Sequence, residues 1–224
     1  GDQYVSCLSV AGGLLLLSRD DNYNSDIWIR KFDGVRWSPA VRMKKGINTK
    51  YWESHATLSR DGRKIYFTSN RKESFGGLDI FMSQIDSTGD WGMPVNLGPV
   101  INSPYNEEAP FLANDDRTLF FSSRGHKNMG GYDIFRSDLD ENGRWGAPVN
   151  LGYPVNTTDD DLFFYPMGEG HTGYYARFDP AGYGKMDIFR YEIFNDLHPR
   201  HFYVTGKAAV ANLREEFAGE IMIK

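Results

Sequence analysis

The triplet Asp79-Ile80-Phe81 decides the fold, because it belongs to a set of four that keeps one period along the chain. The other members are Asp26-Ile27-Trp28, Asp133-Ile134-Phe135 and Asp187-Ile188-Phe189. A fixed period of about 54 residues is typical of architectures in which each unit buries its faces against its neighbours.

Two further markers keep the same period. A tryptophan recurs at Trp37, Trp91 and Trp145, and the last two open phrases that end in Pro-Val-Asn-Leu-Gly. The third marker is an arginine, at Arg19, Arg71, Arg124 and Arg177. The fourth repeat lacks the tryptophan phrase, which is typical of a terminal unit.

Each repeat reads as four short strands. In residues 53–106 the strands are expected at 55–59, 64–69, 79–84 and in the outer phrase that begins at Trp91, with Asp61-Gly62 as a hairpin signal. We therefore predict an all-β fold, a β-propeller of four-stranded antiparallel blades at about 1–52, 53–106, 107–160 and 161–196. A β-sandwich is the alternative, but sandwiches do not repeat sequence markers at a fixed period.

The triplet has a structural explanation. Ile80 and Phe81 point to opposite faces of their strand, so each blade offers an apolar side chain to both neighbours. We expect Ile27, Ile80, Ile134 and Ile188 at equivalent buried positions. Asp79 is expected to accept backbone N–H groups from the Gly76-Gly77 loop, whose glycines would supply positive φ.

Composition excludes several classes of function. The chain has 224 residues, 40% of them hydrophobic, and a formal net charge of -5, which argues against nucleic acid or an anionic lipid surface as the main partner. No apolar run is long enough for membrane insertion. The single cysteine, Cys7, excludes an internal disulfide.

An acid and an arginine face each other in three of the four predicted hairpins. We interpret these pairs as structural locks of their own hairpins, each contributing about 0–1 kcal/mol if exposed. The first repeat places Val5 or Ser6 opposite Arg19, so a ring of charge around the channel would be incomplete. The pairs are Glu53 with Arg71, Glu107 with Arg124, and Asp161 with Arg177.

We predict no catalytic residue, no metal site and no cofactor. A sialidase or glycosidase is the competing hypothesis, but the arginines recur once per blade and no pair of carboxylates stands out. The segment 138–143 matches the first half of a calcium loop, yet the closing position holds Val149. The five histidines show no convincing metal spacing.

The repeats resemble the TolB-type, WD-like propeller repeats of bacterial envelope proteins over about residues 1–196. Residues 58–71, Leu-Ser-Arg-Asp-Gly-Arg-Lys-Ile-Tyr-Phe-Thr-Ser-Asn-Arg, and residues 77–81 carry the resemblance. The outer phrase is similar to the variant in the OmpA family of Bacteroidota, including the PorE proteins of the type IX secretion system. That resemblance implies a propeller of more than four blades in a periplasmic, outer-membrane-associated protein, which contacts peptidoglycan through a neighbouring domain.

The tail at 197–224 fits the same resemblance. Residues 202–210 and 218–223 read as two strands, similar to the opening of a carboxypeptidase-regulatory-like β domain. We expect this segment to be a linker followed by an incomplete sandwich domain.

The expected function is a non-catalytic binding or scaffold module with envelope proteins as partners. The loops at 70–77 and 125–131 are long and rich in glycine, and loops vary without disturbing the core. A carbohydrate-active or glycan-binding propeller remains the alternative, which aromatic side chains and paired acids at one channel mouth would favour. The candidate partner-binding residues are Arg71, Lys72, Phe75, Arg124, His126, Lys127 and Met129.

Overall fold

The computed structural model describes residues 2–21, 23–44, 46–168, 170–182, 186–194 and 198–200. These residues form strands and no helix. The chain divides into one compact unit, Gly1–Glu192, and a second unit, Ile193–Lys224. The two strands predicted at 202–210 and 218–223 lie outside the described residues.

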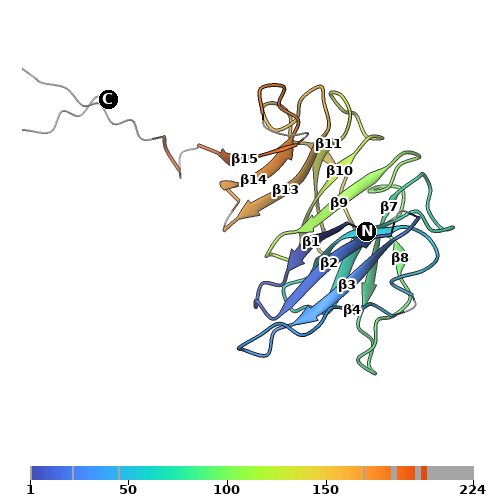
Figure 1. Cartoon of the computed structure of the whole chain (residues 1–224). Helices are drawn as coiled ribbons and strands as arrows, with labels where there is room; N and C mark the ends of the chain where they lie inside the picture. Colours follow the sequence, from blue (N-terminus) through green and yellow to red (C-terminus); the bar gives the residue numbers. More distant parts are fainter. Residues whose placement is uncertain are drawn as a thin grey trace, which may run out of the picture. The chain divides into compact units, whose positions relative to one another are not determined.

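The first unit consists of four antiparallel sheets that follow one another in chain order, from blue to orange in Figure 1. The first sheet contains β1 (Gln3–Leu8), β2 (Leu14–Asp20), β3 (Ser25–Lys31) and β4 (Val41–Arg42). The second contains β5 (Glu53–Leu58), β6 (Lys64–Ser69), β7 (Asp79–Gln84) and β8 (Val95–Asn96). The third contains β9 (Glu107–Leu112), β10 (Thr118–Ser123), β11 (Asp133–Asp138) and β12 (Val149–Asn150), and the fourth β13 (Asp161–Met167), β14 (Thr172–Arg177) and β15 (Asp187–Glu192).

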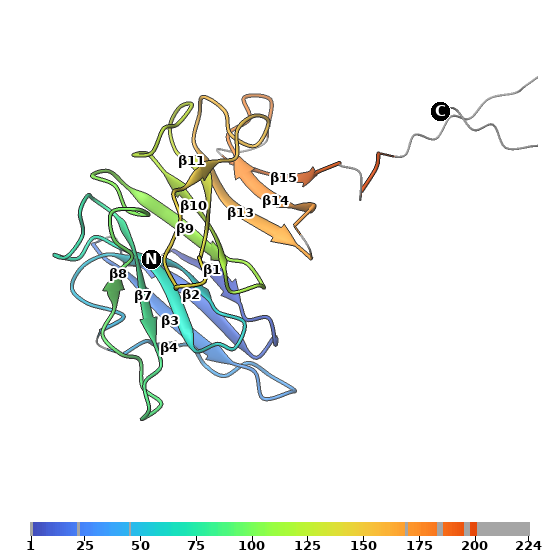
Figure 2. The same cartoon turned by 180° about the vertical axis from the view of Figure 1, so that it is seen from behind.

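This architecture is a β-propeller, as the repeat predicted. The innermost strands β1, β5, β9 and β13 contact one another in succession, and Figure 2 shows β9 beside β13 from behind. Strands β5, β9 and β13 begin at Glu53, Glu107 and Asp161, where the period set the blade boundaries. The fourth blade has three strands among the described residues, so the expected fourth strand does not appear there.

The core lies between the blades rather than within them. Phe81 packs with Leu16 and Ile27 of the first blade, while its neighbour Ile80 packs with Leu119 and Phe121 of the third. The prediction that the two side chains serve opposite interfaces is therefore confirmed. Since each blade interface is built from both neighbours, the stability of one blade depends on the next.

The prediction of four equivalent buried isoleucines is wrong for the last one. Ile27, Ile80 and Ile134 are fully buried, whereas Ile188 is 79% exposed. The first three face a following blade, but within the described residues no strand packs against that face of β15. The period therefore fixes the position of Ile188 in its blade, and a neighbouring blade decides its burial.

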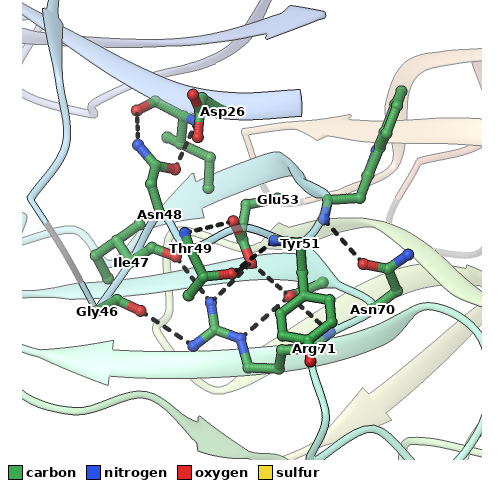
Figure 3. A network of polar contacts seen from close by, with 12 residues as sticks. Asp26, Gly46, Ile47, Asn48, Thr49, Tyr51, Glu53, Asn70 and Arg71 are labelled. Carbon is green, nitrogen blue, oxygen red and sulfur yellow. Dashed lines mark hydrogen bonds and ion pairs between the residues drawn. The ribbon is translucent and has the colours of Figure 1, made fainter. Parts of the chain in front are cut away.

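An asparagine latch repeats at the same period and ties each third strand to the segment that leads into the next blade. The Asn48 side chain accepts the N–H of Ile27 at 2.8 Å and donates to its carbonyl at 2.8 Å. Figure 3 shows this latch beside Thr49, whose N–H and hydroxyl donate to the Glu53 carboxylate. Asn102 and Asn156 make the same pair of bonds to Ile80 and Ile134.

For the loop before β7, the predicted hydrogen bonds to Asp79 are confirmed, but the predicted positive φ of its glycines is wrong. Asp79 accepts the N–H groups of Phe75 and Gly76. Gly76 and Gly77 are not among the residues with positive φ. They are glycines because the next blade approaches closely: a Cβ on Gly76 would lie 2.0 Å from the carbonyl oxygen of Tyr105.

Substitution of Gly76 by Ala tests this close approach. Since the added methyl group meets backbone, the loop or the next blade must shift, and we expect a loss of about 1–3 kcal/mol in the free energy of unfolding. Gly13→Ala is the matched control, because nothing lies within 4 Å of its Cβ position and its φ is not positive. Urea denaturation followed by tryptophan fluorescence measures both, and equal losses would contradict the explanation.

Candidate functional site

The innermost strands share a backbone irregularity that turns side chains toward the centre of the propeller. Register shifts interrupt the pairing of β5, β9 and β13 with their partners. At these bulges His55, Ala109 and Phe163 adopt φ values of 45°, 50° and 58°. Left-handed φ is unfavourable for residues other than glycine, and such strain clusters at functional sites.

The three bulge residues line one cavity of about 270 Å³. Residues from all four innermost strands surround it, so it lies at the centre of the propeller. The edge of the His55 ring meets Phe163 at 5.2 Å between centroids, and Phe111 lies 4.5 Å from Tyr165. We call this cavity the central pocket; its lining residues are Tyr4, Val5, Ser6, His55, Ala109, Pro110, Phe111, Phe163, Phe164 and Tyr165.

A chain of polar groups, which we call the polar wall, starts in the lining of the central pocket at Tyr4 and His55 and continues behind it. The Tyr4 hydroxyl lies 3.3 Å from His55 Nε2. His55 Nδ1 lies 3.6 Å from Glu108 Oε2, and the other oxygen of Glu108 accepts the Tyr132 hydroxyl. Asn106 donates to the same hydroxyl at 3.0 Å. The loop that carries Tyr132 thus connects the pocket to the loop-bearing face of the propeller.

Burial sets the protonation states in this wall. It raises the pKa of Tyr4, and burial together with Glu108 raises the pKa of Tyr132. Burial also lowers the pKa of His55, although the nearby Glu108 opposes that shift. The raised pKa values keep both tyrosines protonated at neutral pH, so their hydroxyl groups are suited to hydrogen bonding and to contact with a ligand.

Replacement of His55 by Asn tests the electrostatics of the pocket. Since the pKa of His55 is lowered in the folded state, the unfolded chain binds this proton first as pH falls below about 6.5. The wild type should therefore lose stability relative to His55→Asn as pH falls from 7.5 toward 5.5. Asn tolerates the left-handed backbone at this position.

Denaturant titrations at several pH values, together with an NMR titration of the imidazole, measure this effect. Parallel pH dependence in the two proteins, or a His55 pKa above the ordinary value, would contradict it. His126→Asn provides a comparison at a half-buried histidine outside the central pocket.

The predicted ion pair of the second blade forms. Arg71 Nη2 lies 3.3 Å from Glu53 Oε1, and both side chains are buried. The guanidinium also donates to the carbonyls of Gly46 and Ile47 and lies over the ring of Phe81, as Figure 3 shows for its polar contacts. Arg71 therefore joins two blades and is not available to a partner.

The predicted pair of Glu107 with Arg124 is wrong. Arg124 instead pairs with Asp160 at 3.1 Å and stacks on Tyr132, and Glu107 accepts Ser103 and Ser123. His126 takes the position that Arg71 has in the second blade. Its Nε2 lies 2.8 Å from the Ile101 carbonyl oxygen, and its ring lies against Phe121 and Phe135.

In the fourth blade, Asp161 lies opposite Arg177 in the strand register. Burial raises the pKa of Asp161, and Arg177 opposes that shift only in part. Their side chains do not form an ion pair within 4 Å. Asp161 accepts Thr157, while Arg177 donates to the Pro154 carbonyl and lies over Phe189. Aspartate is one methylene shorter than Glu53, which accounts for the difference.

The remaining loop candidates are exposed. Lys72, Phe75, Lys127 and Met129 extend from the two glycine-rich loops, so they are available to a partner, as is Arg124 in part. A group of three potential metal-ligating side chains is not found in the part of the chain that the structure describes. In the same residues, no helix has the length and apolar character to cross a membrane.

Sequence reasoning missed the central pocket. The signal was present in the repeat: the acids Glu53, Glu107 and Asp161 keep the period, but two residues later the chain has His55, Ala109 and Phe163. Positions that repeat belong to the scaffold. A position that varies while its neighbours repeat is where an asymmetric site can form.

Comparisons with known proteins concern the fold. No family model and no curated protein sequence matches the chain. TolB from Acinetobacter baumannii is 13% identical with a TM-score of 0.55, and the match covers 86% of this chain and 41% of that chain. A candidate TolB from Agrobacterium tumefaciens is 17% identical with a TM-score of 0.55, covering 83% and 59%. An α-L-arabinofuranosidase from Lactobacillus brevis is 12% identical with a TM-score of 0.52, covering 92% and 75%.

The chain thus spans about half the length of the two TolB structures. At these identities the likeness is one of architecture. Together with the four repeated sheets and their interblade cores, it shows that the chain is a run of β-propeller blades whose fold is similar to that of TolB.

Proposed function

We propose that this propeller is a non-catalytic binding module of the cell envelope, which receives a partner at its loop-bearing face and in the central pocket. The observation that carries the proposal is the set of three strained bulges whose side chains line one cavity. Strain of this kind persists only where the surrounding fold enforces it. A rigid scaffold with a preformed apolar cavity is typical of ligand sites.

The exposed loop residues extend the same binding surface. The loop at 70–77 follows β6 at Ser69, which pairs with Glu53 at the beginning of β5. The loop at 124–132 contributes Tyr132, which contacts Glu108 beside the pocket. Phe75 and Met129 add an aromatic ring and a thioether, side chains that are enriched at protein interfaces. Lys72 and Lys127 add positive charge, which can steer an acidic partner.

The envelope location rests on the resemblance of the repeats to those of the OmpA family of Bacteroidota. On that basis the partner is another periplasmic or outer-membrane protein, the type IX secretion system is one such setting, and peptidoglycan is reached through a neighbouring domain. Cell fractionation tests the location. A protein found only in the cytoplasm would remove this part of the proposal.

Capture of partners from the envelope fraction of the source cell tests the binding role. The variant Lys72→Ala/Phe75→Ala/Met129→Ala, which removes exposed loop side chains, should lose captured proteins. Val95→Ala/Val149→Ala is the matched control, because these valines are exposed on the outer strands β8 and β12. An unchanged set of captured proteins in the loop variant would overturn the role of the loops.

A carbohydrate-active propeller is the second candidate, favoured by the aromatic rings of the central pocket. A glycosidase needs two carboxylates at a set separation, and the described polar wall contributes only Glu108. Assays on aryl glycosides with the wild type and Glu108→Gln separate the two functions. Hydrolysis that disappears in the variant, with stability unchanged, would establish the enzyme and overturn the binding module.

A further inference from the structure

The central pocket has an electrostatic character that selects among ligands. Aromatic rings from three innermost strands line it, those of Tyr4, Phe111, Phe163 and Tyr165, together with the imidazole of His55. The faces of aromatic rings carry negative electrostatic potential. Its described lining contains no lysine or arginine, so nothing there offsets that potential.

A carboxylate lies directly beside the pocket lining. Glu108 lies behind His55, with its side chain 17% exposed and one oxygen 3.6 Å from the imidazole. Arg124, which stacks on the Tyr132 ring, is paired with Asp160. The field inside the pocket therefore favours positive charge and disfavours an anion.

Of the three hydroxyl groups in the described lining, those of Tyr4 and Ser6 are already engaged, while that of Tyr165 is open to a ligand. The Tyr4 hydroxyl is bonded to His55, and the Ser6 hydroxyl lies 2.7 Å from that of Ser18. A sugar would bring several hydroxyl groups into a cavity with few free partners for them, and each unpaired buried hydroxyl is costly. A ligand that needs no directed hydrogen bond fits better.

We infer that the central pocket binds an organic cation with an apolar surface: a trimethylammonium group, either free or at the end of a trimethylated lysine side chain. Aromatic rings with a carboxylate behind them recognise such cations, and a cavity of about 270 Å³ suits a group of this size. The inference rests on the proposed binding function and names the chemistry of its ligand.

Isothermal titration of the full chain tests the inference with choline and its neutral isostere 3,3-dimethylbutan-1-ol. We expect choline to bind with a dissociation constant of about 1 mM or lower. The neutral isostere has the same shape without the charge, and we expect it to bind about tenfold more weakly. Nα-acetyl-Nε-trimethyl-lysine methylamide, titrated in parallel, distinguishes a methylated lysine side chain from a free trimethylammonium ligand.

Two variants assign the contacts. Glu108→Gln keeps an acceptor for Tyr132 and removes the charge, so choline affinity should fall about tenfold while that of the neutral isostere stays unchanged. Structural damage would weaken both ligands alike. Phe163→Ala removes one ring and should weaken choline binding; Ala109 already occupies the equivalent bulge at φ 50°, so the backbone accepts alanine. Phe178→Ala, at an exposed ring outside the pocket lining, is the matched control.

Three results would overturn the inference: equal affinity for choline and its isostere, no effect of Glu108→Gln on choline, or no saturation with any cation well above the expected dissociation constant. The proposed function fails separately. If envelope proteins are still captured by Phe163→Ala while no cation binds the wild type, the binding module stands and its pocket chemistry is wrong. If choline binds but no protein is captured, the pocket stands and the protein partner is wrong.

Discussion

Replacement of Ile134 by Ala lowers the free energy of unfolding by about 2–5 kcal/mol, the usual range for a large apolar side chain truncated in a packed core. Ile134 is fully buried between the third and fourth blades, in a cluster with Phe164 and Tyr175. The substitution removes apolar contact and leaves a cavity that the stacked sheets fill only in part. Guanidinium denaturation monitored by tryptophan fluorescence measures the loss.

Ile188→Ala is the matched control, because it makes the same chemical change at the equivalent position of the fourth blade. With 79% of its surface exposed, Ile188 should contribute less than about 0.5 kcal/mol. A large loss at Ile188 in this chain would mean that something covers that face of β15. Equal small losses at both positions would contradict the interblade core.

Ile134 and Ile188 show which structural properties the repeat predicts and which it does not. The triplet fixes the strand, the face and the register of Ile188, because these depend on local alternation. Burial depends on a neighbour, which no local pattern in the triplet specifies. For the same reason the interfaces formed by Ile80 with the third blade and Phe81 with the first were predictable, since those blades are present in the chain.

The central pocket was less predictable than the fold. Alternation of side chains along β5, β9 and β13 assumes regular pairing, and a bulge changes which side chain faces the centre. His55, Ala109 and Phe163 share a backbone conformation, but their side chains differ in chemical type. No sequence motif therefore marks the three positions. The candidate partner-binding residues were predicted from the residue types in the two glycine-rich loops. Residue type alone does not show that Arg71 and His126 make contacts between blades.

The largest electrostatic effect is expected at Arg71. Its replacement by Ala leaves Glu53 buried without its cation and removes donors from the carbonyls of Gly46 and Ile47. Removing one partner of a buried pair typically costs about 3–5 kcal/mol. Arg124→Ala, at the equivalent marker of the third blade, breaks an exposed pair with Asp160 and should cost about 0–1 kcal/mol.

A double-mutant cycle separates charge from packing at this site. Arg71→Met keeps an apolar stem over the Phe81 ring but leaves the Glu53 carboxylate unpaired. Glu53→Gln is the second single variant, and Glu53→Gln/Arg71→Met removes both charges. If the loss in Arg71→Met comes mainly from the unpaired carboxylate, the second substitution restores part of the stability, and the coupling energy is about 1–3 kcal/mol. Additive losses would show that Arg71 acts through its bonds to the Gly46 and Ile47 carbonyls alone.

The comparison of Arg71→Ala with Arg124→Ala tests the difference between the second and third blades. In the third blade His126 occupies the position of the guanidinium, and Arg124 lies at the surface. Equal losses of stability in the two variants would contradict this difference.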